Sequence, residues 1–115
     1  MKSIGDDLPI MSFKTREDLR TWLMNNHTTS AGIWLRIYKK SAEMPSVTFE
    51  EVLDEGLCFG WSESMRRKGG EQSYLQKFTP RRTKGTTSKR NLEHMERLIA
   101  EGKMMPAGLK ALGIE

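Results

Sequence analysis

The chain has 115 residues, which is the length of one domain, and it carries a formal net charge of +4 with a pI near 9.4. No apolar run approaches the roughly 18 residues of a membrane-spanning helix, and the N-terminus lacks the apolar segment of a signal peptide. Cys58 is the single cysteine, so an internal disulfide framework is excluded and we expect a cytoplasmic protein.

The first third of the chain predicts a lead, a helix and a strand. Residues 1–12 are expected to form a flexible N-terminal lead, and residues 13–115 a single domain. Thr15 can cap a helix that runs to about Asn26, because its hydroxyl accepts a hydrogen bond from a free backbone N–H of the first turn. Apolar and polar residues then alternate, which predicts a strand over Ile33–Lys39.

The middle of the chain predicts a second helix and a hairpin. Thr48 and Glu51 have the spacing of a capping box, so a helix is expected from there to about Leu57. We next expect a strand over Cys58–Arg67, followed by an antiparallel strand over Ser73–Thr79. The Gly69-Gly70 pair between them favours a tight hairpin turn.

The last third predicts two helices. Ser88 caps the first, which Gly102 closes, and a short helix runs from Pro106 to Gly113. The apolar face of the first helix is predicted to hold Leu92, Met95, Leu98 and Ile99. Together these elements predict an α+β fold with a small antiparallel sheet of about three strands, including the hairpin, covered by helices.

Positive charge is concentrated between Leu57 and Asn91. This stretch holds nine Lys and Arg residues against two Glu, a net +7, so the rest of the chain sums to −3. Guanidinium groups bind carboxylate or phosphate bidentately. Because Pro80 fixes the local backbone, Arg81 and Arg82 leave the strand in a defined direction. The free N–H groups at the Ser88 helix start would add a second anion-binding element.

Each candidate in this stretch has a structural alternative. Arg81 or Arg82 could pair with Glu63 or Glu71 and brace the loop instead of binding a ligand. Trp61 could form the floor of a pocket or could belong to the core. Glu63 could be a general base or a salt-bridge partner. The predicted ligand-binding residues are Trp61, Glu63, Arg66, Thr79, Arg81, Arg82, Ser88 and Asn91.

No catalytic or metal-binding signature is present in the sequence. Cys58 lies in an apolar setting, and neither His27 nor His94 has a local spacing that implies a base for it, so a buried structural thiol is expected. The same three residues lack the spacing of a metal site. The phosphate-binding and dinucleotide-binding glycine motifs are absent, and we expect neither a metal nor a cofactor.

Several clusters of residues, in the same order along the chain, resemble the YdeI/OmpD-associated family of bacterial proteins, also called bacteriocin-protection proteins. They are Trp34-Leu35-Arg36-Ile37-Tyr38-Lys39-Lys40, Val47-Thr48-Phe49-Glu50-Glu51, Leu57-Cys58-Phe59-Gly60-Trp61, Phe78-Thr79-Pro80-Arg81-Arg82, Ser88-Lys89-Arg90-Asn91, and Gly102-Lys103-Met104 with Pro106-Ala107-Gly108. The chain departs from that pattern at Ser62-Glu63, Gly85 and Thr87. The resemblance implies a role in tolerance to bacteriocins or antimicrobial peptides, with an indirect link to an outer-membrane porin.

Three functions from different classes remain open at this point. The first is a non-enzymatic binding domain that recognises an anionic small molecule, phosphorylated ligand or partner through the arginine-rich hairpin and loop. The second is an enzyme acting on a small anionic substrate with Glu63 as base. The third is sequence-tolerant nucleic-acid binding, with Trp61, Tyr74 or Phe78 stacked on bases. The sequence does not indicate an oligomeric state.

Overall fold

The computed structural model describes residues 8–81 and 89–113. Four strands form one mixed sheet in the order β1-β2-β4-β3. Their bounds are β1 (Ile10–Ser12), β2 (Ile33–Tyr38), β3 (Trp61–Lys68) and β4 (Ser73–Pro80). The helices are α1 (Arg16–Asn26), α2 (Phe49–Phe59), α3 (Lys89–Ala100) and α4 (Pro106–Ala111), with a 3₁₀ turn η2 (Lys40–Ala42). The predicted α+β class is confirmed, with four strands in place of about three.

The additional strand lies in the segment predicted as a flexible lead. β1 runs parallel to β2, with Ile10 opposite Trp34 and Ser12 opposite Arg36. The sheet is therefore mixed, whereas the sequence predicted an antiparallel one. Three residues give too short a pattern for period-two alternation to be recognised, and their pairing depends on a strand more than 20 residues away.

The two helix starts predicted at Thr15 and Thr48 are confirmed. The hydroxyl of Thr15 accepts a hydrogen bond from the Asp18 N–H at 3.1 Å, at the start of α1. Thr48 and Glu51 form the reciprocal capping box at the start of α2. These short-range bonds satisfy backbone N–H groups that have no partner inside the helix, so local sequence is enough to place both helix starts.

The strand predicted to begin at Cys58 is wrong at its start. Cys58 and Phe59 form the last turn of α2, and β3 begins only at Trp61. Gly60 is therefore a helix C-cap with φ +78°, not a strand residue. A short apolar run is compatible with a buried helix end and with a strand. The glycine at position 60 marks where the helix ends and the strand begins.

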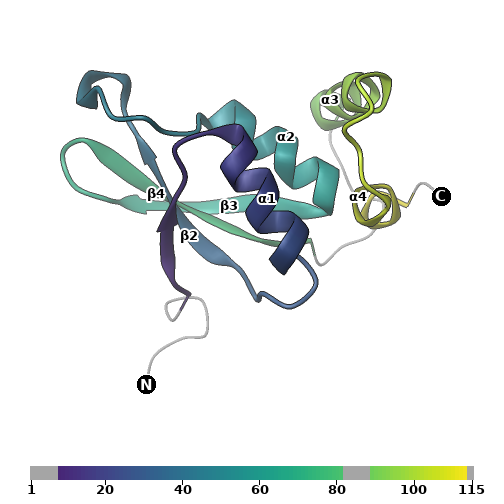
Figure 1. The fold of residues 1–115 in the computed structure, drawn as a ribbon, viewed down its shortest axis with the longest axis horizontal. Helices are drawn as coiled ribbons and strands as arrows, with labels where there is room; N and C mark the ends of the chain where they lie inside the picture. The colour runs from purple at the N-terminus through teal and green to yellow at the C-terminus, as the bar shows by residue number, and fades with distance from the viewer. Residues whose placement is uncertain (1–7, 82–88, 114–115) are drawn as a thin grey trace.

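The core lies between the sheet and α1 and α2, which sit on the same side of the sheet (Figure 1). It includes Leu19 and Leu23 of α1, Leu57 of α2, and Leu35 and Phe78 of the sheet, all at most 1% exposed. Trp34 and Leu75 are also buried but do not belong to this core cluster. The alternation of β2 and β4 places them on the opposite face of the sheet.

α3 and α4 pack against α2 at the edge of the molecule (Figure 1). Gly108 of α4 lies so close to α2 that an added Cβ would collide with the carbonyl oxygens of Leu57 and Cys58. α3 buries only Met95 and Leu98, while Leu92 and Ile99, predicted on its inner face, are 37% and 46% exposed. Because α3 packs against a single helix, its buried face is narrower than the apolar face that the sequence pattern predicted. None of the described helices combines the length and apolar character needed to cross a bilayer.

Candidate functional site

Trp61 belongs to the core, the alternative given for it from the sequence. Its side chain is 1% exposed, and its ring packs against Trp22 and Phe78 with centroids 5.6 and 5.1 Å away. The indole N–H donates to the carbonyl oxygen of His27 at 3.4 Å. Since Phe78 is also fully buried, neither ring is accessible for stacking on a base or a ligand.

Glu63 and Thr79 are neighbours in the hairpin but lie on opposite faces of the sheet. Glu63 pairs with Phe78 on the core side, while Thr79 pairs with Ser62. Successive side chains of a strand point to opposite faces, so Glu63 and Thr79 diverge. Both are half-buried. The hairpin therefore does not bring these two predicted ligand residues together.

Arg66 is fixed far along the hairpin from Arg81. Its guanidinium lies over the rings of Phe49 and Tyr74, at 5.0 and 4.5 Å from their centroids. Its Nε donates to Oε1 of Gln76 at 3.2 Å. Because Arg66 pairs with Gln76, five residues before Arg81 on the same strand path, the two arginines are about 16 Å apart along the strand direction.

The arginine loop itself is described only at its start. The backbone N–H of Arg81 donates to the carbonyl oxygen of Gly60 at 2.9 Å, which ties the loop to the end of α2. Arg82 and Ser88 lie outside the described residues. Asn91 is half-buried in the first turn of α3. The proposed convergence of Arg81, Arg82 and the helix start stays a prediction.

The sheet brings together a different set of cations, on the face opposite the core. Arg36 of β2 and Arg67 of β3 both stand opposite Leu75 of the central strand β4, so the three residues form a row across three strands. Lys77 stands opposite Trp34 in the neighbouring row. We call Arg36, Arg67 and Lys77 the cationic face.

Two members of the cationic face have a fixed orientation. Nη1 of Arg36 donates to the carbonyl oxygen of Gly69 at 2.6 Å and to Oγ of Ser73 at 2.8 Å. The guanidinium of Arg67 stacks over the ring of Trp34, 4.8 Å from its centroid. Such contacts hold the guanidinium group in one orientation, so the side chain loses less conformational entropy when a ligand binds.

Sequence reasoning missed this face because it depends on strand register. Alternation along β2 is enough to place Trp34, Arg36 and Tyr38 on one side of the sheet. Only the pairing of both β2 and β3 with β4 shows that Arg36 and Arg67 meet across Leu75. A bulge in β3, where Ser64 and Met65 stand opposite Lys77, also shifts the register between Glu63 and Arg66.

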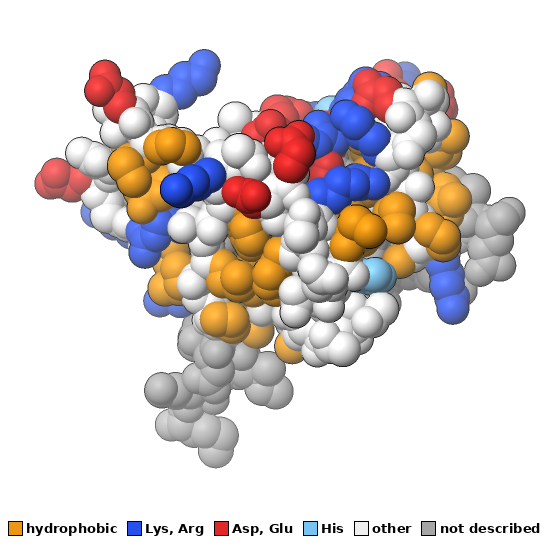
Figure 2. Space-filling model, viewed as in Figure 1, with side chains coloured by type: hydrophobic (Ala, Val, Ile, Leu, Met, Phe, Trp, Pro, Cys, Tyr) orange, Lys and Arg blue, Asp and Glu red, His pale blue; other side chains and the backbone are white. Residues whose placement is uncertain are grey.

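The cations around the hairpin differ from those on the helix side in their partners. In the described part of the chain, no carboxylate lies within ion-pair distance of Arg36, Arg66, Lys68 or Lys77. On the helix side, acidic and basic side chains lie next to one another above the junction of α1, α2 and α3 (Figure 2).

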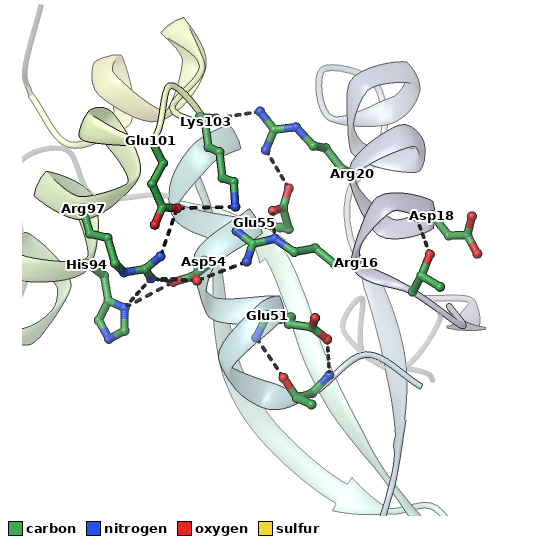
Figure 3. A network of polar contacts seen from close by, with 12 residues as sticks. Arg16, Asp18, Arg20, Glu51, Asp54, Glu55, His94, Arg97, Glu101 and Lys103 are labelled. Atoms are coloured by element: carbon green, nitrogen blue, oxygen red, sulfur yellow. Dashed lines mark hydrogen bonds and ion pairs between the residues drawn. The ribbon is translucent and has the colours of Figure 1, made fainter. Parts of the chain in front are cut away.

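A network of ion pairs joins α2 to α1 and α3 (Figure 3). Glu55, which is fully buried, accepts from Arg16 at 2.6 Å and from Arg20 at 2.8 Å. Asp54, 6% exposed, accepts from Arg97 of α3 at 2.8 Å and lies 3.2 Å from Nδ1 of His94 and 3.5 Å from Arg16. Two buried carboxylates thus hold two helices against a third.

Local spacing does not reveal the partners of Asp54. Glu93 and Arg97 have the i,i+4 spacing of a helix-surface pair, but Arg97 bonds Asp54 and Glu101 instead. Nδ1 of His94 lies 3.2 Å from Asp54. Asp54 and His94 are 40 residues apart, so no local spacing could reveal the pair.

The network shifts the proton affinity of three groups. The hydrogen bond with Asp54 raises the pKa of Arg97. Burial opposes the charge of Arg20, but its contacts with Cys58 and Glu55 outweigh that effect, so the pKa of Arg20 is raised. Burial raises the pKa of the Cys58 thiol, and the nearby Arg20 only partly offsets this. Cys58 is therefore held as a neutral thiol at neutral pH, which is unfavourable for a nucleophile.

Residues 11–111 match the model of the family described as Domain of unknown function (DUF8412). The chain belongs to this family. The match spans β1 to α4, so the sheet, the helix network and the cationic face all fall within the DUF8412 domain. No curated protein and no solved structure gives a significant match to the chain. In the described residues, this DUF8412 domain has no group of three His, Cys, Asp or Glu side chains placed to hold a metal ion.

Proposed function

We propose that this domain is a non-enzymatic binding domain that recognises a carboxylate- or phosphate-bearing ligand through the cationic face of its sheet. Arg36 and Arg67 stand in one row across the sheet, and Lys77 lies in the next row. Neighbouring strands are about 4.8 Å apart, so the backbones of Arg36 and Arg67 are roughly 10 Å apart. Arg36 commits only Nη1 to the protein, so its other N–H donors remain for a ligand that spans this row. Arg67 leans over Trp34, which stands opposite Lys77, so Arg67 and Lys77 lie close to the same end of that ligand.

The observation that carries the proposal is that cations on the helix side have carboxylate partners, whereas two members of the cationic face have none in the described part of the chain. Asp54, Glu55 and Glu101 neutralise the cations of the helix side. Around the hairpin, Arg36 and Lys77 have no described carboxylate partner. A cation without an internal counter-ion gains the most from an external one, because no existing pair has to be broken.

The residues in the hairpin favour binding over catalysis. Glu63, the proposed base, makes no described hydrogen bond or ion pair with a second titratable group. Nucleic-acid binding is also less favoured, because Trp61 and Phe78 are core residues. Tyr74 lies beneath the guanidinium of Arg66. The stacking platform that single-stranded binding requires is thus not supplied by these rings.

The motifs that resemble the YdeI/OmpD-associated family support a biological setting for this binding. We place the protein in the bacterial cytoplasm, where the single thiol of Cys58 stays reduced. There, capture of an anionic ligand would be the domain's contribution to tolerance of bacteriocins or antimicrobial peptides. Gly60 and Gly108, which belong to those motifs, allow α2 and α4 to pack closely and support the fold rather than the site.

A thermal-shift screen with citrate, pyrophosphate and a single-stranded oligonucleotide tests the proposal. We expect citrate or pyrophosphate to raise the melting temperature, and Lys77→Gln to reduce that rise. Lys110→Gln removes the same charge from an exposed position of α4 and is the matched control. Equal effects of the two variants would show a response to net charge alone and contradict the proposal. A steeply salt-dependent response to the oligonucleotide only would favour nucleic-acid binding instead.

A further inference from the structure

A second candidate site lies beside α1, which packs on the core side of the sheet (Figure 1). A depression of about 590 Å³ lies between the end of β1 and the exposed side of α1. Its volume falls within the roughly 300–1,000 Å³ that is typical of small-molecule sites. Two aromatic rings, Phe13 and Trp22, are part of its lining.

Trp22 is held in place by two other aromatic rings. Its ring lies 6.0 Å from Phe13, and it meets the core residue Trp61 edge to face at 5.6 Å. Trp22 is itself half-buried, so part of the indole remains on the surface. A rigid aromatic ring that is already positioned loses little entropy when a ligand packs on it.

The polar side chains around this ring keep most of their hydrogen-bonding capacity. In the described part of the chain, the side chains of Asp18, Thr21 and Asn25 make no hydrogen bond, and the indole N–H of Trp22 has no acceptor. Asn26 uses its amide N–H on the Trp22 carbonyl oxygen at 2.8 Å. The depression thus offers a carboxylate, a hydroxyl, an amide and an indole N–H within the reach of one small ligand.

The charge of the lining is balanced. Lys14 and Asp18 contribute one positive and one negative charge, and the other lining residues are neutral. A site without net charge does not select an anion or a cation. Mixed donors and acceptors beside an indole ring match the chemistry of a sugar ring, which presents hydroxyl groups at its rim and C–H groups on its faces.

We propose that the depression between β1 and α1 binds a neutral cyclic polyol, such as one monosaccharide unit. The C–H face of the sugar ring packs on Trp22. The hydroxyl groups exchange hydrogen bonds with Asp18, Thr21 and Asn25. The site is separate from the cationic face in residues and in ligand chemistry, so neither proposal depends on the other.

The test is a titration of the full chain with glucose and N-acetylglucosamine, followed through ¹⁵N–¹H NMR spectra. The chain has three indole N–H groups, on Trp22, Trp34 and Trp61. We expect saturable shifts of the Trp22 indole and of the Asn25 side-chain amide, while the Trp34 indole stays in place. Asn25→Ala should weaken binding about two- to tenfold, the loss of one hydrogen bond. Met24→Ala, an exposed neighbour on the same helix, is the control and should leave the affinity unchanged.

Asn25 is exposed, so its replacement leaves the fold intact and the result interpretable. Shifts confined to Trp22 and Asn25 that are reduced in Asn25→Ala support the proposal. Absence of shifts at high millimolar sugar overturns it, as do shifts that Asn25→Ala and Met24→Ala affect equally. A response to glycine or another zwitterionic amino acid, with none to the sugars, would overturn the polyol assignment because it would point to binding between Lys14 and Asp18.

Discussion

Nη2 of Arg97 on α3 donates to both carboxylate oxygens of Asp54 on α2, each at 2.8 Å. Asp54 is nearly buried, whereas the Arg97 side chain is 43% exposed. The contact therefore links a buried acid to a cation that reaches it from the surface. Since α3 buries only two residues, this pair carries a large part of the attachment of α3 to the domain.

Replacing Asp54 with Asn should lower the free energy of unfolding by about 1–3 kcal/mol. The variant removes the counter-charge of Arg97 and Arg16, but Arg97 can rehydrate, which limits the loss. Glu50→Gln is the matched control, because it removes the Glu50–Arg90 pair, whose side chains are 57% and 63% exposed. It should change stability by less than about 0.5 kcal/mol. Urea unfolding of both variants checks the difference, and equal losses would contradict this assignment.

Glu55→Gln should be more damaging, at about 3–5 kcal/mol, because it leaves two guanidinium groups beside an uncharged amide in a buried setting. The same change one turn earlier, Glu51→Gln, provides the control. Glutamine can take the place of glutamate in a capping box, so this variant should stay within about 0.5 kcal/mol of the native chain. Denaturant unfolding distinguishes them. A loss for Glu55→Gln as small as for Glu51→Gln would show that the network adds little to stability.

Gly108→Ala should detach α4 from α2. The added methyl group would collide with two backbone carbonyl oxygens, which cannot change rotamer to make room. We expect a loss of about 1–3 kcal/mol. Amide hydrogen exchange should become faster over α4 than over α1. Lys110→Ala, on the exposed side of α4, should leave the exchange pattern unchanged, and a similar result for Gly108→Ala would be inconsistent with this close contact.

Local chemistry was sufficient to predict those parts of the fold that depend on neighbouring residues. Thr15 and the Thr48–Glu51 capping box placed two helix starts, because the bonds that define them span three residues. The glycine pair after Lys68 located the hairpin for the same reason. β1 was missed, since its pairing is with a distant strand. Cys58 and Phe59 were assigned to a strand because a run of apolar residues has no polar positions to show whether its period is that of a helix or of a strand.

The candidate site was harder to predict than the fold. The sequence located an excess of positive charge between Leu57 and Asn91, and the hairpin strands carry Arg66, Arg67, Lys68 and Lys77 of it. It did not reveal which of Arg66 and Arg67 lies on the core side of the sheet, or that Arg36 meets Arg67 across Leu75. Both facts depend on register and on a bulge in β3, which are properties of paired strands and not of either strand alone.

The Cys58 thiol should make stability depend on pH in the alkaline range. Burial raises its pKa in the folded state above the roughly 8.5 of an unfolded chain. The folded protein then holds its proton to higher pH than the unfolded chain does. The stabilisation is complete below about pH 8.5 and declines above it, by at most about 1.4 kcal/mol per pH unit.

Urea unfolding between pH 7.5 and 9.5 under reducing conditions measures this slope. Cys58→Ala removes the titrating group, so its stability should fall less steeply over the same range, whatever its absolute stability. Parallel slopes for the native chain and the variant would contradict the assignment of the alkaline loss to Cys58.

The most direct measurement of the central claim is an NMR titration of the ¹⁵N-labelled chain with pyrophosphate. Anion binding at the cationic face predicts saturable shifts at Arg36, Arg67 and Lys77, with the side-chain signals of Arg16 and Arg97 unchanged. Shifts located on the helix side, or a response that never saturates and disappears in moderate salt, would contradict it.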